Sequence, residues 1–534
     1  MQVSSKGKVV LPTEGITVRR SGKYPYVYKI LKAYRNEEGK PTNDRIRIGT
    51  LDIQSGLLIP NANYWELYGN ADIPESFPSY QSVRAIGASY AVSRILQSLG
   101  VDKILESVCG KSRAQNILTA AIYMVCRGNI FERVYDWCEG YTFDNNPLNS
   151  TTASMLFSSI TFDERMQFFK AWIAVQLIDS LLAYDVTSFS THATCINDAE
   201  WGYNRDKDNL PQINLSCYLG HESHLPMFYV TYPGSITDKT HLPYMMAYNE
   251  ELGIIDVTFS MDRGFCKTDN IKYMHSSPSK TYIIGAELSH KASFTALKEV
   301  REDIVSMKNS ISQGVYGRAI HSRFYGVTTT LHIYFDPNSA EGQRQTLYRT
   351  IESEEHELSR LEAMTKKEFK HYNRHFDIDL KSDGSFSFSR NYFKIDEVAK
   401  NLGFFGIFTN TGANSENVLA DYRRKDVIEK GFDELKNHID MKRLRTHNDT
   451  TTEGKMFCAF IALIAVSKMS TLLTDFMKSK SMSKDGLISE LEKIKIVTMS
   501  DGTRLMNPLT KTQRTIFNAC GLTEDTLNAF VYAG

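Results

Sequence analysis

Several features that would place the 534-residue chain in a special class are missing. It has no net charge at pH 7, no CxxC pair among its eight cysteines, no internal repeat and no tract of low complexity. Scattered cysteines in a chain of this length are typical of reduced intracellular thiols and disfavour a zinc site. With 42% hydrophobic and 23% charged residues, the composition indicates an ordinary globular protein.

Long apolar runs are missing as well. The opening segment MQVSSKGKVVLP lacks an apolar stretch of signal-peptide length. The most apolar stretch, near residues 456–466, is too short to span a bilayer and predicts a buried helix. We find no glycine-rich nucleotide-binding loop of the P-loop type. These absences predict a cytoplasmic protein with no membrane role and no nucleotide cofactor.

The charge that is present is distributed unevenly. Residues 1–49 hold eleven lysines and arginines, Lys6 and Lys23 among them, against four acids. Such an excess attracts phosphate backbones through Coulomb forces and counterion release. An alternative is a solvated face that serves only solubility. Residues 24–60 also alternate aromatic or β-branched residues with polar ones, which predicts a small β-hairpin unit that is basic on one face.

The rest of the chain changes character twice. Residues 82–170 show helical spacing of apolar residues and predict a helical bundle. Short apolar runs of strand length follow, including SLLAYDVTSFS, PQINLSCYLG, PMFYVTYPG and IIDVTFSMDRG, with a helical stretch before the last one. Strands mixed with helices predict an α/β core, or α+β mixed.

Three acidic residues are candidates for chemistry. Asp185 lies inside the apolar strand-like run LLAYDVTSFS, Asp262 ends the run IIDVTFSMDRGF, and Glu429 lies on a helix after the strand-like GIFTN. Functional groups collect at strand ends in α/β sheets, and an all-oxygen set of carboxylates suits hard cations such as Mg²⁺. Each acid alone also has an ordinary interpretation: a strand-end cap, a turn residue and a solvated helix residue.

The predicted helix around Glu429 is more informative. At 100° per residue, Tyr422, Lys425, Glu429 and Lys436 fall on one stripe of a continuous helix over residues 415–439. An acid flanked by cations fits a site where phosphates are held beside metal ions. The alternative is ordinary pairing of Lys425 with Glu429 on an exposed helix.

This ordered set resembles the DDE class of insertion-sequence transposases, in the branch marked by a tyrosine–arginine–glutamate–lysine box. The box, Y-x₂-R-x₃-E-x₆-K, falls on Tyr422, Lys425, Glu429 and Lys436, with Arg424 beside the lysine that replaces the arginine. YDVTSFS, SMDRGF and GIFTN are similar to the family's first-acid strand, second-acid motif and the strand before the glutamate helix.

The resemblance implies a ribonuclease-H-like catalytic core interrupted by a β-rich insertion, preceded by a small β unit and a helical bundle. Applied to this chain it divides the sequence into six parts: a basic, DNA-binding N-terminal region (1–80), a helical bundle (81–178), the first part of the core (179–288), the insertion (289–401), the second part of the core (402–480) and a C-terminal helical region (481–534). Relatives stack an aromatic residue of the insertion on a displaced base. If this chain performs that step, Tyr316, Phe324 and Tyr325 are the candidates; the alternative is that the chain lacks the step.

The resemblance also implies the activity. Asp185, Asp262 and Glu429 would hold two Mg²⁺ or Mn²⁺ ions, cut double-stranded DNA at terminal inverted repeats and join the freed 3′-OH to target DNA. Contacts to DNA would come from Tyr422, Arg424, Lys425, Lys436 and Arg263, and the active form would be a homodimer on the paired ends. Two alternatives stay open: a DNA-binding relative without catalysis, and a metal nuclease of the same fold that cuts without joining.

Overall fold

The computed structural model describes residues 8–21, 24–53, 55–68, 80–142, 147–311, 314–382 and 384–532. Lys6 and Lys23, counted above among the N-terminal cations, lie outside these residues. The described chain forms two compact units: Met1–Ser82 with Val497–Leu505, and Val83–Ile496 with Met506–Gly534. Each unit is described by itself.

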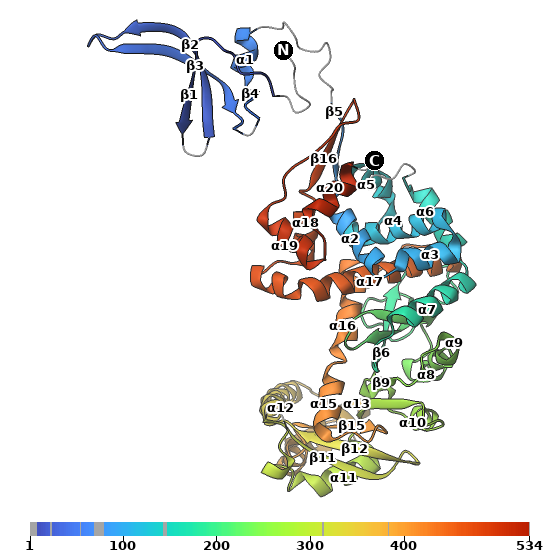
Figure 1. Cartoon of the computed structure of the whole chain (residues 1–534). Helices are drawn as coiled ribbons and strands as arrows, with labels where there is room; N and C mark the ends of the chain where they lie inside the picture. Colours follow the sequence, from blue (N-terminus) through green and yellow to red (C-terminus); the bar gives the residue numbers. More distant parts are fainter. Residues whose placement is uncertain are drawn as a thin grey trace. The chain divides into compact units, whose positions relative to one another are not determined.

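The first unit is built on an antiparallel sheet of order β1-β2-β3-β4 (Figure 1). Its strands are β1 (Ile16–Ser21), β2 (Tyr24–Arg35), β3 (Pro41–Leu51) and β4 (Leu58–Pro60), and helix α1 (Ala62–Tyr68) packs on β3 and β4. One face covers a small core of Val9, Val27, Ile48, Leu58 and Tyr64. The hairpin predicted over residues 24–60 is therefore present as β2 and β3, and it packs only one face.

Helices dominate the start of the second unit, as the spacing over residues 82–170 predicts. They are α2 (Gly87–Ser98), α3 (Val101–Cys109), α4 (Lys111–Arg127), α5 (Val134–Tyr141), α6 (Ser150–Ser159) and α7 (Phe162–Gln176). Capping residues fix the start of α7: Thr161 accepts from the Glu164 backbone N–H, and Glu164 accepts from the Thr161 N–H.

The long helix α17 (Asp449–Lys480) packs against α2, α4 and α6. It has 32 residues, so the apolar run near 456–466 is part of a much longer helix than the sequence predicts. Its length and hydropathy would suit a membrane span, but 78% of its most apolar window is buried inside the fold. Burial on all sides is typical of the central helix of a packed core.

An eight-stranded sheet follows in the order β11-β12-β15-β10-β9-β6-β7-β8. Its strands are β6 (Leu181–Ser190), β7 (Gln212–Gly220), β8 (Pro226–Pro233), β9 (Thr258–Met261), β10 (Thr281–Ala286), β11 (Tyr316–Phe324), β12 (Val327–Phe335) and β15 (Phe404–Thr409). Strands β6, β7 and β8 pair antiparallel, whereas β9 runs parallel to both β6 and β10. This mixed sheet with covering helices confirms the predicted mixed α/β class.

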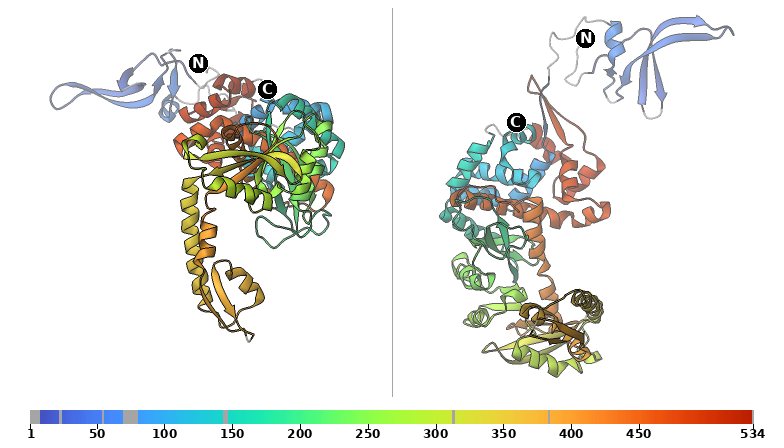
Figure 2. Two further views of the ribbon diagram at one scale, coloured as in Figure 1. Left: turned by 90° about the horizontal axis from the view of Figure 1, so that it is seen from below. Right: turned by 180° about the vertical axis from the view of Figure 1, so that it is seen from behind.

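The segment predicted as a β-rich insertion, residues 289–401, is mixed. Its strands β11 and β12 join the edge of the eight-stranded sheet through β15. The remainder forms a smaller part with its own apolar core, to which the long helix α12 contributes (Figure 2). Its elements are α12 (Pro337–Leu358), α13 (Lys366–Tyr372), β13 (Phe376–Leu380), β14 (Phe386–Arg390) and α14 (Tyr392–Ala399). Helix α11 (Lys291–Arg301) instead packs against β11 and β12 and buries its apolar residues in the main core.

Shorter elements complete the described chain. Helices α8 (Asp238–Ala247), α9 (Asn249–Leu252) and α10 (Thr268–Met274) connect strands β8, β9 and β10. Strands β5 (Tyr80–Ala85), β16 (Lys495–Met499) and β17 (Arg504–Met506) form a three-stranded sheet. Helices α18 (Lys484–Leu491), α19 (Lys511–Ala519) and α20 (Glu524–Tyr532) lie toward the C-terminus.

Candidate active site

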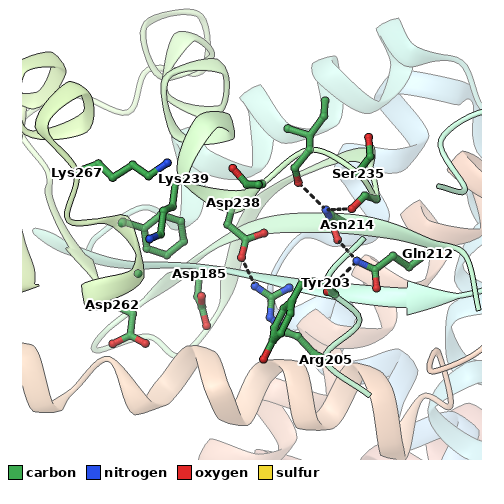
Figure 3. Close-up of a pocket in the computed structure, with 15 residues that line it drawn as sticks. Asp185, Tyr203, Arg205, Gln212, Asn214, Ser235, Asp238, Lys239, Asp262 and Lys267 are labelled. Atoms are coloured by element: carbon green, nitrogen blue, oxygen red, sulfur yellow. Dashed lines mark hydrogen bonds and ion pairs between the residues drawn. The ribbon is translucent and has the colours of Figure 1, made fainter. Parts of the chain in front are cut away.

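Asp185 and Asp262 lie side by side at one level of the sheet. Strands β6 and β9 are parallel and paired, with Tyr184 opposite Met261, and each acid is the next residue along its strand. Both acids line a cleft of about 530 Å³ (Figure 3). The expectation that functional groups gather at strand ends therefore describes Asp262, which directly follows β9, whereas Asp185 lies in mid-strand.

Asp185 is the most constrained of the candidate acids. It is the one residue of β6 that is not fully buried, and its neighbours on both sides are apolar. Burial raises the pKa of its carboxyl to about 6, with a smaller contribution in the same direction from Asp262. The Val186 N–H, Arg205 and Lys425 act in the opposite direction. A carboxylate held this way gains from any cation that enters the cleft.

Asp262 faces the solvent more openly and is held by two side chains from the glutamate segment. The Tyr422 hydroxyl donates to its Oδ1 at 3.2 Å, and the Lys425 Nζ lies 3.7 Å from the same oxygen. Gly285 on β10 makes this contact possible, because a Cβ there would lie 2.5 Å from the Tyr422 hydroxyl and 2.9 Å from the Arg263 nitrogen. Nothing in the sequence around Gly285 indicates this role.

Glu429 reaches the same region through Lys425. The Lys425 Nζ donates to Glu429 Oε1 at 3.0 Å, so one ammonium lies between the carboxylates of Asp262 and Glu429. Burial acts to lower the pKa of Lys425, but Asp262 and Glu429 outweigh it, and the pKa is raised. Helix α16 (Asp426–Asp433) positions Glu429 by packing on β6 and β7, where Gly431 lies so close that a Cβ would approach the Leu219 side chain to 2.7 Å.

The donor set fits a hard divalent cation in its chemistry. Over the ranges of the chain that the structure describes, no three Asp, Glu, His or Cys side chains form a ready-made metal cluster. The three acids nevertheless offer only oxygen donors, which Mg²⁺ and Mn²⁺ prefer. Two of them already share a cation, Lys425, and the third, the half-buried Asp185, lies beside Asp262. The site therefore has the negative charge and the ligand type that such ions need.

The predicted continuous helix over residues 415–439 is wrong. The structure contains α15 (Ser415–Arg423), then α16, then a π-helical turn at Glu434–His438. Between α15 and α16, the N–H groups of Lys425, Val427 and Ile428 each bond to a carbonyl three residues back. Tighter and wider turns shift the phase of the helix, so a calculation at a constant 100° per residue fails.

That phase shift separates Lys436 from the other box residues. Its Nζ donates to Asp206 Oδ2 at 2.9 Å instead of facing the acids. Arg424 is exposed and lies 3.8 Å from Asp421, and Arg263, directly after Asp262, is exposed as well. Of the predicted DNA-contacting residues, Tyr422 and Lys425 touch the acid cluster in this structure.

Other residues of the cleft were not predicted from the sequence. The guanidinium of Arg205 pairs with Asp238, and the Tyr232 hydroxyl donates to the same carboxylate at 2.9 Å. Lys239 and Lys267 line the cleft on the side of Asp262 (Figure 3). The only signal in the sequence was the charged run NRDKD after the first-acid strand. These cations make the cleft suitable for an anionic substrate.

Two of the predicted stacking residues are unavailable. Phe324 and Tyr325 are buried, and Tyr325 stacks on His290 with ring centroids 4.4 Å apart. The expectation that they stack on a base is therefore wrong, because their rings complete the core beside Phe408. Tyr316 is partly buried. The most exposed aromatic rings of the same segment are on α14, where Tyr392 and Phe393 are 68% and 76% exposed.

Comparison with known proteins assigns the family. The family model described as "Transposase DDE domain" matches residues 177–465, which is more than half of the chain and includes all three candidate acids. The chain therefore belongs to the DDE transposases. This confirms the resemblance at the level of the family.

No curated protein matches the sequence. Among solved structures, the chain is similar to one titled "Cryo-EM structure of piggyBac transposase synaptic complex with hairpin DNA (SNHP)". The two share 9% sequence identity with a TM-score of 0.36, over 77% of this chain and 80% of that chain.

Proposed function

We propose that this transposase cuts DNA at the terminal inverted repeats of an insertion sequence and joins the freed 3′-OH to target DNA. The observation that carries the proposal is the meeting of Asp185 and Asp262 on adjacent parallel strands, with Glu429 linked to them through Lys425. We infer that β6 to β10 form a ribonuclease-H-like core and that residues 422–436 are the box of the tyrosine–arginine–glutamate–lysine branch.

The three acids would hold two Mg²⁺ or Mn²⁺ ions. Such ions activate an oxygen nucleophile and stabilise the oxygen that leaves a phosphodiester. The protein's own contribution is positional. Strand register places Asp185 beside Asp262, and the Tyr422 hydroxyl orients the Asp262 carboxylate. Lys425 balances the repulsion between Asp262 and Glu429 and would be free to contact a phosphate once divalent ions are present.

Cations around the acids would hold the DNA backbone. Lys239 and Lys267 line the cleft. Arg263 directly follows Asp262 in the sequence, Arg424 directly precedes Lys425, and both arginines are exposed. Lys436 anchors the segment through Asp206 in this structure, so its contact with DNA requires that this ion pair opens. We propose a homodimer that pairs two element ends, working on chromosomal or plasmid DNA in the cytoplasm.

The first experiment compares the wild type with Glu429→Gln on labelled DNA that carries the element's own end, with Mg²⁺ present. We expect the wild type to cut and join, and Glu429→Gln to bind the same DNA without cutting. Asp426→Asn is the matched control, because it removes one exposed carboxylate from the first turn of the same helix. It should retain cleavage.

Other outcomes would identify a different function. Equal cutting by Glu429→Gln and the wild type would remove Glu429 from the metal site. Binding without any cutting by the wild type would favour a DNA-binding protein that has lost catalysis. Cutting without joined product would favour a nuclease of the same fold.

A further inference from the structure

Among the residues of the first unit that the structure describes, no third strand pairs with the outer half of the β2–β3 hairpin. Strand β1 pairs with β2 only as far as Lys29, and β4 pairs with β3 only from Gly49. Between these limits, residues 30–45 form a two-stranded ribbon whose only recorded strand pairing is between β2 and β3 (Figure 1). Every described side chain from Leu31 to Pro41 is exposed. An isolated two-stranded ribbon is marginally stable in water, so this one is suited to fit against a partner.

The ribbon and its base are rich in positive charge. Residues 29–47 hold six lysines and arginines and three acids. Two of the acids are already engaged: Glu38 lies 2.8 Å from Lys40, and Asp44 accepts a hydrogen bond from the Tyr34 hydroxyl at 3.1 Å. Lys32, at the middle of the ribbon, and Arg47, at its base, have no carboxylate partner among the recorded ion pairs of the described chain. The excess of positive charge on this surface therefore favours the binding of a polyanion.

Two arginines at the base of the ribbon are held in a fixed orientation. Arg45 lies over the ring of Tyr28 at 5.1 Å and Arg47 over the ring of Tyr26 at 3.9 Å. Strand pairing places Tyr28 opposite both Thr17 and Arg47, so these residues share the face that points away from the core of Val27 and Ile48. A guanidinium that rests on an aromatic ring is held in place and can still donate to a phosphate oxygen, although one N–H group of Arg47 already donates to the Thr50 hydroxyl at 3.4 Å.

We propose that this ribbon enters the major groove of duplex DNA, an assignment that rests on the proposed transposase function and gives its N-terminal unit a defined mode of contact. The major groove accommodates a two-stranded β-ribbon. Arg35 and Asn43, which the strand register places on the same face as Arg45 and Arg47, would lie in the groove, where side chains of these types bond to guanine and adenine edges. Arg45 and Arg47 would bind the phosphates that flank it.

A different role for these charges has a different consequence. Lysines and arginines on exposed strands also discourage edge-to-edge aggregation. A purely protective role predicts that DNA affinity is independent of the ribbon. The two roles can therefore be separated by measuring DNA binding.

The test uses the full chain and a labelled duplex of mixed sequence, about 30 bp long, at about 0.15 M salt. The ribbon variant is Arg35→Ala/Arg45→Ala/Arg47→Ala, which removes the three arginines on the face proposed to meet DNA. Its control is Lys478→Ala/Lys480→Ala/Lys511→Ala, which removes three exposed cations from α17 and α19. We expect the ribbon variant to lose about tenfold in affinity and to show a shallower salt dependence, with the control unchanged. Circular dichroism and the melting temperature verify that both variants fold.

A second arm tests the groove. One duplex carries glucosylated 5-hydroxymethylcytosine, which fills the major groove, and another is saturated with netropsin, which fills the minor groove. We expect wild-type affinity to fall only on the glucosylated duplex and the ribbon variant to bind all three duplexes alike. Equal binding of unmodified DNA by wild type and ribbon variant would overturn the proposal. So would a wild type that is insensitive to the glucosyl groups.

Failure of this inference is distinguishable from failure of the proposed function. If the ribbon is not the contact, the wild type still cuts element ends and the ribbon variant binds like the wild type. If the chain is not a transposase, binding still depends on the ribbon, but no end is cut.

Discussion

The two largest sheets of the described chain meet solvent in opposite ways. In the eight-stranded sheet, β6 and β7 are buried almost throughout. Asp185 is the single partly exposed residue of β6. In the four-stranded sheet, only one face packs on a core, and β2 and β3 extend beyond it into a ribbon with exposed side chains. A buried sheet can hold carboxylates at fixed positions against their mutual repulsion, whereas an exposed ribbon can reach a partner. The difference indicates that the eight-stranded sheet is suited to chemistry and the four-stranded sheet to contact with a partner.

The largest effect expected is on chemistry at the buried sheet. Asp185→Asn and Asp262→Asn should each reduce end cleavage by about 10³-fold or more, because each removes a negative ligand from the proposed metal site. The two variants should differ in stability. Asp185→Asn should be more stable than the wild type at pH 8, since burial disfavours its charged carboxylate, and Asp262→Asn should change little.

Cleavage assays and thermal melts at pH 8 measure both quantities. A stabilising effect of Asp262→Asn equal to that of Asp185→Asn would show that the two acids do not differ in environment as described.

The small sheet should be the more fragile of the two. Ile48 is fully buried in a core of few residues, so Ile48→Ala should cost about 2–5 kcal/mol and unfold the first unit. The equivalent change in the large sheet, Ile284→Ala, also removes a fully buried side chain but from a far larger core.

Trp65, which packs on Tyr64, provides a fluorescence signal within the first unit. We expect Ile48→Ala to lose this signal at a lower temperature than the helical circular dichroism, and Ile284→Ala to leave it in place. Simultaneous loss of both signals in Ile48→Ala would show that the two units unfold together.

A buried lysine gives the second unit a distinctive dependence on pH. Lys455 is 3% exposed, and its Nζ donates to the Leu444 carbonyl at 3.0 Å and to Asn129 Oδ1 at 3.3 Å. Burial lowers its pKa to about 7, compared with about 10.4 in the unfolded chain. Between these values the folded state binds fewer protons than the unfolded state, so stability rises with pH by about 1.4 kcal/mol per pH unit.

Lys455→Met should abolish that slope. Urea unfolding at pH 7.5 and pH 9 gives the change in the free energy of unfolding with pH, which is compared between the variant and the wild type. Parallel slopes in the two proteins would mean that Lys455 stays charged in the fold.

The smallest effect concerns the helix that carries Glu429. Gly431→Ala places a Cβ 2.7 Å from the Leu219 side chain, which is itself buried on β7. We expect a loss of about 1 kcal/mol, because overpacking exceeds the gain in helix propensity. Gly342→Ala on α12 is the control, since a Cβ there meets nothing within 4 Å, and it should gain up to about 1 kcal/mol.

Denaturant unfolding measures both variants, and cleavage by Gly431→Ala should also fall as Glu429 moves from the sheet. A stabilising Gly431→Ala would show that Leu219 can rotate away without cost.

Local patterns in the sequence were sufficient for much of this fold. Short apolar runs predicted β6, β9 and β15, and helical spacing predicted α2 to α7, because those elements bury residues at the period of a strand or a helix. The joining of β11 and β12 to the main sheet was not predictable in the same way. Strand pairing depends on partners far away in sequence, which local alternation does not specify.

The candidate site shows the same limit on what local sequence patterns can predict. Asp185, Asp262 and Glu429 could be selected because an acid inside or beside an apolar strand is conspicuous. Gly285, which leaves room for the Tyr422 hydroxyl, and Asp206, which binds Lys436, act only through contacts across the fold. The breaks on either side of α16 depend on hydrogen bonds that a constant helical repeat cannot represent.

The pairing of Tyr184 with Met261 also determines where this gene can change length. Because side chains alternate faces along a strand, inserting or deleting one residue between Leu181 and Asp185 would turn Asp185 away from Asp262. The same holds from Thr258 to Asp262. Length changes in the loops that connect these strands leave that register intact. Natural variation in length should therefore be purged from the few codons on either side of the two acids.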